Sequence, residues 1–170
     1  MLRLRHALTL HGRVLDAGGH PAARAEVEVA CENEEEPHVT RGDADGFFRL
    51  GGLPDGRCRL LARSGTQAAE RILALTPGQA SGVEVRLRRA ASLRLRPPEA
   101  PAGSGTFRVL RDDLVIATGR LAPADAVVLV LPGGPARCEF RSARSTETRD
   151  VVLNDGETAE IVFGGAGAPR

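Results

Sequence analysis

Neither tryptophan nor tyrosine occurs in this 170-residue sequence, and five phenylalanines are its only aromatic residues. Any apolar core must therefore be filled mainly by valine, leucine, isoleucine and alanine. The same absence excludes the large exposed tryptophan and tyrosine platforms on which sugar rings usually stack. Only Phe47, which is predicted to point outward, could take that role.

An excess of charge of one sign is also lacking, because 23 basic residues face 22 acidic ones for a net charge of +1. The electrostatic attraction that dominates nucleic-acid binding is therefore missing, and we expect no nucleic-acid partner. Long hydrophobic runs are absent too. The longest, Ala126–Leu131, has the length of a strand, so we expect no membrane span. Residues Met1–His6 lack the apolar region of a signal peptide.

Cysteine is scarce, since Cys31, Cys58 and Cys138 are the only three and none has a Cys-x-x-Cys spacing. An odd number without that spacing indicates neither a disulfide framework nor a zinc site, so we expect buried free thiols. Free thiols and the missing signal peptide together favour a cytoplasmic location. An extracytoplasmic location is expected instead if the sequence is a fragment of a longer protein.

What the sequence does contain is a series of short alternating segments separated by turn residues, with no sustained helical spacing. In Ala25–Cys31, for example, the odd positions are all apolar. The acidic stretch Glu32–Pro37 must be a loop, because consecutive like charges repel in a strand and proline cannot donate to a ladder. The pattern predicts an all-β fold. Further strands of the first half are predicted at Leu8–Leu10, Gly12–Asp16, His38–Thr40, Phe47–Leu50, Cys58–Ala62 and Val83–Leu87.

Turn and core residues of the first half resemble a known family in their order along the chain. They are Gly12, Val14, Asp16, Gly19, Pro21, Ala25, Val27, Thr40, Asp45-Gly46-x-Phe48 and Leu53-Pro54-x-Gly56. This order resembles the carboxypeptidase regulatory-like domain. The resemblance implies a small transthyretin-like β-sandwich with Greek-key pairing, used as a structural or accessory module. One departure is Cys58, where the family commonly has an aromatic residue.

The second half repeats the first more faintly. The Leu-Pro pairs at Leu53 and Leu131 are 78 positions apart (131 − 53), and a glycine pair, Gly78 and Gly156, has the same offset. With a two-residue insertion, Cys58 aligns with Cys138. These correspondences indicate a diverged duplicate of the first domain.

The predicted organisation is therefore two consecutive small β-sandwich domains of Greek-key, transthyretin-like type. The first covers residues 1–91 and the second covers residues 92–164. Within the second domain, Phe107–Ala117 is predicted to form a hairpin. Residues 165–170 are predicted to be a disordered tail.

No arrangement of side chains points to catalysis. His6 and His11 are five positions apart in extended chain, so they point to opposite faces and cannot share a metal. His20 and His38 lie in or beside loops, and no Gly-x-Ser-x-Gly motif is present. Intradiol dioxygenases and hydroxyisourate hydrolases, which have related sandwich folds, use tyrosine, and this sequence has none. We predict no enzymatic activity, no cofactor and no catalytic or metal-binding residue.

The predicted function is a non-catalytic structural or protein-interaction module that acts as a spacer, adaptor or assembly subunit. A carbohydrate- or calcium-binding accessory module is the alternative, and a cryptic hydrolase is a remote one. The oligomeric state is left open. The tripeptide Arg41-Gly42-Asp43 spells an integrin-binding motif but is interpreted as a hairpin turn.

Two charged surfaces are candidates for binding a protein partner. The first is an arginine-rich outer sheet face, predicted to be exposed to solvent, with Phe47 as its aromatic member. Its arginines are Arg57, Arg59, Arg63, Arg86, Arg88, Arg94 and Arg96. The second is an acidic loop formed by Glu32, Glu34, Glu35 and Glu36.

Overall fold

The computed structural model describes residues 7–32, 34, 36–77, 82–97, 104–123 and 125–164. Every regular element in these ranges is a β-strand, so the predicted all-β fold is confirmed. The chain divides into two compact units, Met1–Arg89 (unit 1) and Ala90–Arg170 (unit 2). The predicted disordered tail, 165–170, lies outside the described residues.

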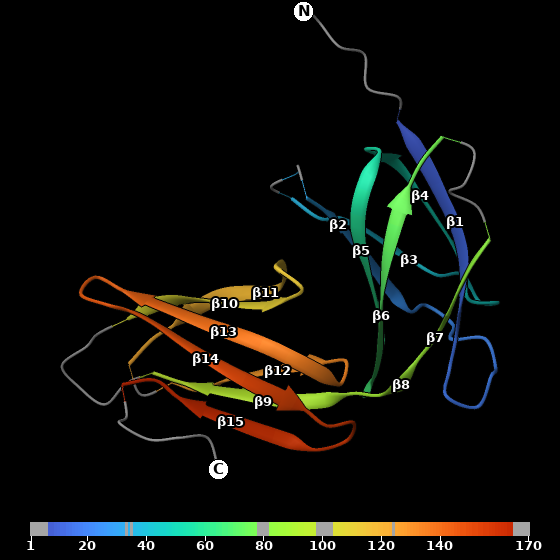
Figure 1. Ribbon diagram of the computed structural model, residues 1–170. Helices are drawn as coiled ribbons and strands as arrows, with labels where there is room; N and C mark the ends of the chain where they lie inside the picture. The colour runs from blue at the N-terminus through green and yellow to red at the C-terminus, as the bar shows by residue number, and fades with distance from the viewer. Residues whose placement is uncertain are drawn as a thin grey trace, which may run out of the picture. The chain divides into compact units, whose positions relative to one another are not determined.

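Unit 1, drawn in blue to green in Figure 1, contains two β-sheets. In the small sheet, of order β4-β1-β7, β1 pairs antiparallel with β4 and parallel with β7. The large sheet has the order β3-β2-β5-β6-β8, and all its pairs are antiparallel. The strands are β1 (Leu8–Leu15), β2 (Glu26–Cys31), β3 (His38–Arg41), β4 (Phe47–Leu53), β5 (Gly56–Ser64), β6 (Gln67–Leu75), β7 (Val83–Arg86) and β8 (Arg88–Arg89).

Alternation along these strands sends every second side chain into one apolar core, as expected for a sandwich. The small sheet contributes Leu10 and Val14, and the large sheet contributes Leu60 and Ala62. Phe48 is the one aromatic residue of this core. Side chains at the intervening positions lie on the outer faces of the two sheets, where the candidate surfaces are found.

Unit 2, drawn in green to red in Figure 1, also contains two sheets. Their orders are β12-β9-β15 and β11-β10-β13-β14. Its core is richer in aromatic residues, because Phe107, Phe140 and Phe163 are all buried. The strands are β9 (Ala91–Arg96), β10 (Gly105–Arg111), β11 (Leu114–Leu121), β12 (Val127–Leu131), β13 (Gly134–Ser142), β14 (Thr146–Leu153) and β15 (Thr158–Val162).

The two units share one strand topology. β9 pairs antiparallel with β12 and parallel with β15, as β1 does with β4 and β7. The order β11-β10-β13-β14 likewise corresponds to β3-β2-β5-β6. β5 and β13 both begin at a glycine with positive φ, Gly56 and Gly134, and both have nine residues. By position in the strand, Cys138 therefore matches Leu60 and not Cys58.

Two local elements show where the sequence pattern was informative and where it was not. The predicted hairpin at Phe107–Ala117 forms from β10 and β11, whose connecting residues Asp112 and Asp113 both have positive φ, as a type I′ turn requires. By contrast, β6 was not predicted. Its apolar residues do not alternate strictly with polar ones, and six consecutive residues between Ala68 and Leu75 are half-buried or exposed.

Candidate interaction surfaces

Three of the predicted arginines lie together on the outer face of the large sheet of unit 1. Because the core of unit 1 takes Cys58, Leu60 and Ala62, the intervening arginines of β5 point the other way. Each meets a glutamate of the β2 segment. The pairs are Arg57 with Glu32 at 3.2 Å, Arg59 with Glu28 at 3.0 Å, and Arg63 with Glu28 at 3.9 Å and Glu26 at 4.0 Å.

Arg59 was predicted to be exposed, and that prediction is wrong. Its side chain is only 1% exposed, although it lies on the outer face. Burial lowers the pKa of the Arg59 guanidinium, and the negative charges of Glu28 and Glu70 oppose that effect. Pairing with carboxylates is what allows a guanidinium to remain charged away from water. The outer face of β5 is therefore a compensated ion-pair network rather than a free cationic surface.

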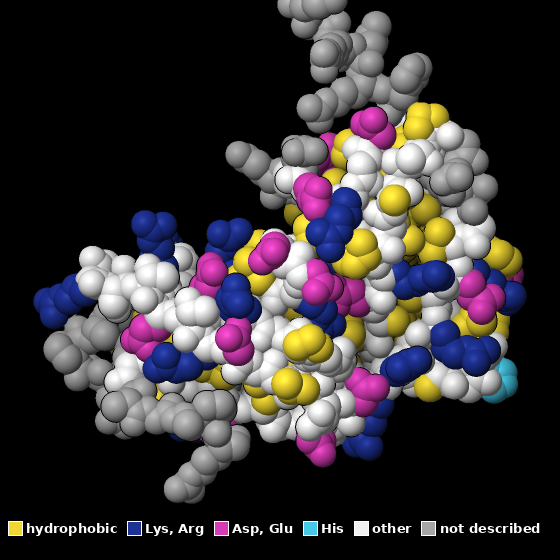
Figure 2. Space-filling view, in the orientation of Figure 1, with side chains coloured by type: hydrophobic (Ala, Val, Ile, Leu, Met, Phe, Trp, Pro, Cys, Tyr) yellow, Lys and Arg dark blue, Asp and Glu magenta, His cyan; other side chains and the backbone are white. Residues whose placement is uncertain are grey.

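The other four arginines do not join this group. Arg86 belongs to β7 in the small sheet, and Arg88 belongs to β8 at an edge of the large sheet. Arg94 and Arg96 lie on β9 in unit 2, where Arg96 pairs with Glu160 at 2.8 Å. On the face seen in Figure 2, basic and acidic side chains are interspersed. The seven arginines thus occupy three different sheets and do not form one continuous sheet face.

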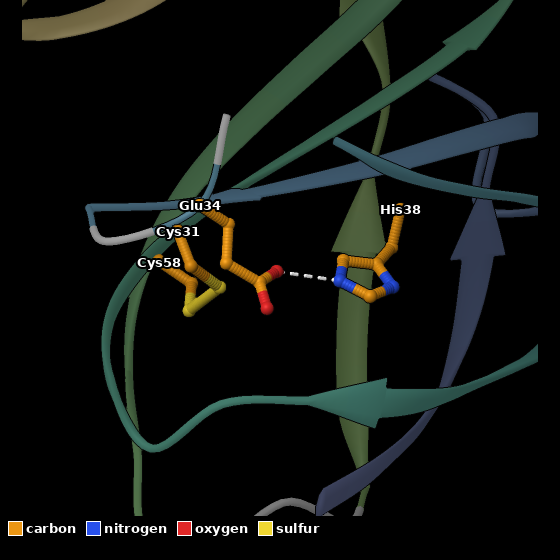
Figure 3. The surroundings of a disulfide bond; sticks show 4 residues. All are labelled: Cys31, Glu34, His38 and Cys58. Carbon is orange, nitrogen blue, oxygen red and sulfur yellow. Dashed lines mark hydrogen bonds and ion pairs between the residues drawn. A yellow bond between two sulfur atoms is a disulfide. The ribbon is translucent and has the colours of Figure 1, made fainter. Parts of the chain in front are cut away.

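The acidic loop carries one contact of its own. Glu34 forms a 2.6 Å contact with Nε2 of His38, while Glu32 forms an ion pair with Arg57. Figure 3 shows the Glu34 carboxylate directed toward the imidazole, in the surroundings of a disulfide bond. Glu36 is exposed, and Glu35 lies outside the described residues.

That disulfide joins Cys31 to Cys58, so the prediction of free thiols is wrong for these two residues. The cause is the register of the large sheet, in which Cys31 of β2 lies directly opposite Cys58 of β5. Cys138 is a buried free cysteine as predicted. Burial raises the pKa of its thiol to about 12, which keeps it protonated at neutral pH.

Phe47 faces outward, as predicted, and is 53% exposed. It lies on the outer face of the small sheet, where it lines a groove of about 510 Å³. In the register of this sheet, Phe47 of β4 lies opposite Arg13 of β1, which lies beside Glu84 of β7. The neighbouring pair on the same face is His11 and Arg49. We call these five residues the Phe47 surface.

Local contacts hold the Phe47 surface in place. The Arg13 guanidinium stacks over the Phe47 ring at 4.8 Å, and Arg13 Nε donates to the carbonyl oxygen of Asp45. The backbone N–H groups of Asp45 and Phe47 donate to Oδ1 of Asp43. Asp43 therefore shapes the turn that starts β4, which agrees with the turn interpretation of Arg41-Gly42-Asp43.

A groove of about 620 Å³ in unit 2 had no counterpart in the sequence predictions. It is lined by charged side chains of four strands and of the β10–β11 turn. Arg111 donates to the carbonyl oxygens of Pro132 and Pro135, and Arg137 Nε donates to Asp150 Oδ1 at 3.1 Å. The bond to Asp150 raises the pKa of Arg137. Because Arg111 belongs to the β10–β11 hairpin and the Arg137–Asp150 pair to the β13–β14 hairpin, only the sheet register could have revealed the groove.

Neither a cluster of metal ligands nor a membrane-spanning helix is found in the described ranges. Within those ranges, no three histidine, cysteine, aspartate or glutamate residues are grouped as metal ligands would be. The described part of the chain also contains no helix with the length and apolar character needed to cross a membrane.

Unit 1 is therefore a small β-sandwich module whose small sheet carries the Phe47 surface on its outer face. Residues 9–88 match the family model of the carboxypeptidase regulatory-like domain, so the family prediction for the first half is confirmed. No curated protein matches the sequence.

Several solved structures are similar to this chain at low identity. The Bacillus anthracis TIE protein is 15% identical with a TM-score of 0.40, over 92% of this chain and 33% of that one. Catechol 1,2-dioxygenase from Acinetobacter is 13% identical with a TM-score of 0.40, over 50% and 53%. The minor pilin of Streptococcus agalactiae is 9% identical with a TM-score of 0.37, over 91% and 94%. The chain thus spans a third of the first structure and about half of the second, and such weak similarities assign no function.

Proposed function

We propose that this chain is a non-catalytic protein-interaction module, serving as a spacer, adaptor or assembly subunit, and that unit 1 binds its partner through the Phe47 surface. The observation that carries this proposal is the exposure of Phe47. The sequence has five phenylalanines, and the other four are buried: Phe48, Phe107, Phe140 and Phe163.

Exposing an aromatic ring to water costs free energy, and the neighbours of Phe47 are suited to a protein interface. Aromatic and arginine side chains are enriched at protein interfaces and dominate their binding energy. Phe47 and Arg13 are already stacked and lie on paired strands, so little side-chain entropy is lost when a partner binds. The stacked pair therefore has the properties of a preorganised binding anchor.

The charges around Phe47 define the chemistry of the partner. Arg13, Arg49 and His11 bring basic groups, and Glu84 is the acidic member of the surface. A partner segment with an apolar side chain flanked by carboxylates would complement this pattern. The arginines of β5 are a poorer candidate, because glutamates already neutralise them.

We also propose that unit 2 is a diverged duplicate of unit 1. The shared pairing of β1 and β9, together with the common length and glycine start of β5 and β13, supports this proposal. An exposed aromatic side chain is not found in the described part of unit 2. The partner-binding function proposed for Phe47 would then belong to unit 1 alone.

The disulfide bears on where the chain acts. Free thiols were one of two reasons to expect the cytoplasm, and that reason no longer applies to Cys31 and Cys58. Disulfides persist in oxidising compartments. We therefore favour an extracytoplasmic location, which thiol labelling of the protein in intact cells would test by the redox state of these two residues.

Photo-crosslinking tests the proposed partner directly. Benzoylphenylalanine would replace Phe47 in the full chain inside the source cells, and a matched variant would carry it at Val39. Val39 is 56% exposed but lies on β3 in the other sheet. We expect a discrete crosslinked protein from position 47 that is absent from position 39. Equal crosslinking at both positions, or none at position 47, would contradict the proposal.

A glycan array and a calcium titration by calorimetry test the alternative. A glycan that binds with a micromolar Kd and is lost in Phe47→Ala would make the Phe47 surface a carbohydrate site instead. Calcium binding of similar strength would favour the metal-binding alternative. In either case, the protein-partner proposal would be replaced.

A further inference from the structure

The edges of the four sheets differ in one respect that bears on assembly. An edge strand has backbone groups without a strand partner, and proteins usually protect it with charged residues, proline or bulges. The edge strands of the described sheets are β3, β4, β7, β8, β11, β12, β14 and β15. Seven of these eight carry at least one charged side chain, and β12 carries none.

β12 is apolar on both of its faces. Its sequence is Val-Val-Leu-Val-Leu, from Val127 to Leu131. Val127, Leu129 and Leu131 face the core of unit 2. Val128 and Val130 point outward and are 58% and 38% exposed. A strand with one solvated face normally alternates apolar and polar residues, so this pattern resembles a strand that is covered on both faces.

The corresponding strand of unit 1 has the protection that β12 lacks. β4 is also the antiparallel neighbour of a central strand at the edge of its sheet. It carries Arg49 on its outer face, and near its end it contains Gly51 and Gly52, which weaken strand pairing. The unprotected edge is thus specific to unit 2.

We propose that two copies of this chain pair through their β12 strands, antiparallel to each other and across a two-fold axis at Leu129. Leu129 then lies opposite Leu129 of the second copy, and Val128 lies opposite Val130 of the second copy. The three-stranded sheets of the two copies become one continuous six-stranded sheet. The interface lies in unit 2, so it does not depend on the Phe47 surface of unit 1.

The self-complementarity of β12 identifies a second copy as the occupant. A strand that pairs antiparallel with itself obeys the two-fold symmetry that closes a dimer. The register centred on Leu129 pairs all five residues, and it places core-facing residues beside core-facing ones and outer valines beside outer valines. Pairs of β-branched residues are favourable cross-strand neighbours.

The residues that flank β12 fit the same register. Pro132 follows the strand and ends the ladder, since it has no N–H to donate. Asp125 would lie opposite Gly133 of the second copy, whose N–H donates to the Asp155 carboxylate, so the two carboxylates would face each other only beyond the ends of the five-residue ladder. Arg94, which lies beside Val128 on β9, would be separated from its copy by three strand spacings, roughly 14 Å. At that distance, salt screens their repulsion.

Sedimentation equilibrium and light scattering on the full-length, oxidised chain test the proposal. We expect a concentration-dependent monomer–dimer equilibrium for the natural sequence. The double variant V128K/V130K places lysine opposite lysine twice in the antiparallel register and should weaken dimerisation by at least about tenfold. The variant V128K/V130E places lysine opposite glutamate twice, and it should dimerise as well as the natural chain or nearly so.

Together, the two double variants show whether the β12 strands pair antiparallel or parallel, as well as whether β12 forms the interface. In a parallel pairing, V128K/V130E would place lysine opposite lysine and would fail to dimerise. V39K is the matched control, because Val39 is a similarly exposed valine on an edge strand of unit 1. It should leave the equilibrium unchanged. Circular dichroism and thermal unfolding of each variant as a monomer check that the substitutions leave the fold intact.

Four results would overturn the proposal. The natural chain could remain monomeric at concentrations of several hundred micromolar. V128K/V130K could dimerise as strongly as the natural chain, which would place the interface elsewhere. V128K/V130E could fail to dimerise while folded, which would exclude the antiparallel register. A dimer abolished by Phe47→Ala would likewise assign the contact to unit 1 rather than to β12.

Discussion

At Gly12, the small sheet of unit 1 leaves no room for a side chain. A Cβ atom there would lie 2.4 Å from the carbonyl oxygen of Val83 and 2.5 Å from the ring of Phe48. We expect Gly12→Ala to lower the free energy of unfolding by about 1–3 kcal/mol, as measured by urea denaturation. Gly51→Ala is the control, because its Cβ would be 3.6 Å from Thr9 Oγ1. Equal effects at the two glycines would contradict the steric explanation.

The thiol of Cys138 makes the stability of unit 2 depend on alkaline pH. Burial raises its pKa from 9.0 to about 12, so between these values the unfolded chain releases the proton and the folded chain keeps it. Stability is therefore unaffected below pH 9 and falls as the pH rises toward 12, by at most about 1.4 kcal/mol per pH unit.

This pH effect can be measured with little interference. The sequence contains no lysine and no tyrosine, and the cysteines of the disulfide do not titrate. Urea denaturation at pH 8 and pH 10.5 should show a loss of stability in the natural chain that is absent in Cys138→Ala. The variant is expected to be less stable at both pH values. This does not affect the test, because the quantity compared is the change in unfolding free energy between pH 8 and pH 10.5. Identical changes of unfolding free energy with pH in the two proteins would show that the thiol titrates normally in the fold.

Residue positions were easier to predict than residue partners. The alternation of β5 correctly placed Arg57, Arg59 and Arg63 on the outer face of their sheet. It could not reveal that Arg59 is buried, because burial depends on the strands beside it and on which glutamates they bring. Phe47 needed no partner to be placed correctly, since the turn at Asp43 and the phase of β4 were enough.

At the scale of the elements, the sequence likewise could not predict which strands pair or in which register. Cys31 and Cys58 are 27 residues apart, and the acidic loop and β3 lie between them in the sequence. Each was assigned correctly to the apolar phase of a strand. Nothing in that assignment says that β2 and β5 are neighbours with these two residues opposite each other. The count of three cysteines then favoured free thiols over a single bond with one thiol left over.

The pairing of β2 with β5 also allows two ion pairs of the same chemistry to be compared. Arg59–Glu28 is largely buried, whereas both partners of Arg57–Glu32 are 44% exposed. Glu28→Gln leaves a buried guanidinium with a weaker partner and should cost about 2–3 kcal/mol. Glu32→Gln should cost less than about 1 kcal/mol. Urea denaturation of both variants checks the difference, and equal costs would mean that Arg59 is solvated.

At the scale of the whole molecule, the duplicated topology makes each unit a complete sandwich with its own core. The two clusters of buried apolar residues share no member. The single disulfide lies wholly within unit 1, and the free thiol lies wholly within unit 2. Each unit therefore carries a chemical handle that the other lacks, and their stabilities can be changed separately.

Reduction of the Cys31–Cys58 bond should consequently destabilise one unit and leave the other unchanged. Opening this cross-link restores entropy to the unfolded chain and should cost unit 1 about 2–4 kcal/mol. Hydrogen exchange with mass spectrometry at increasing urea concentration resolves the units without tryptophan fluorescence, which this sequence cannot supply. Strands β1 to β7 should lose protection at lower urea after reduction, while β9 to β15 keep theirs.

A substitution in the second core provides the reciprocal measurement. Phe140 is buried and stacks on Phe163 with the ring centroids 5.0 Å apart. Phe140→Leu removes that stack and leaves a partly filled cavity, so it should destabilise unit 2 by about 1–3 kcal/mol. The hydrogen-exchange protection of unit 1 should not change. If reduction and Phe140→Leu each lowered the protection of both units together, the chain would unfold as one cooperative body, and the two cores would have to be stabilised jointly.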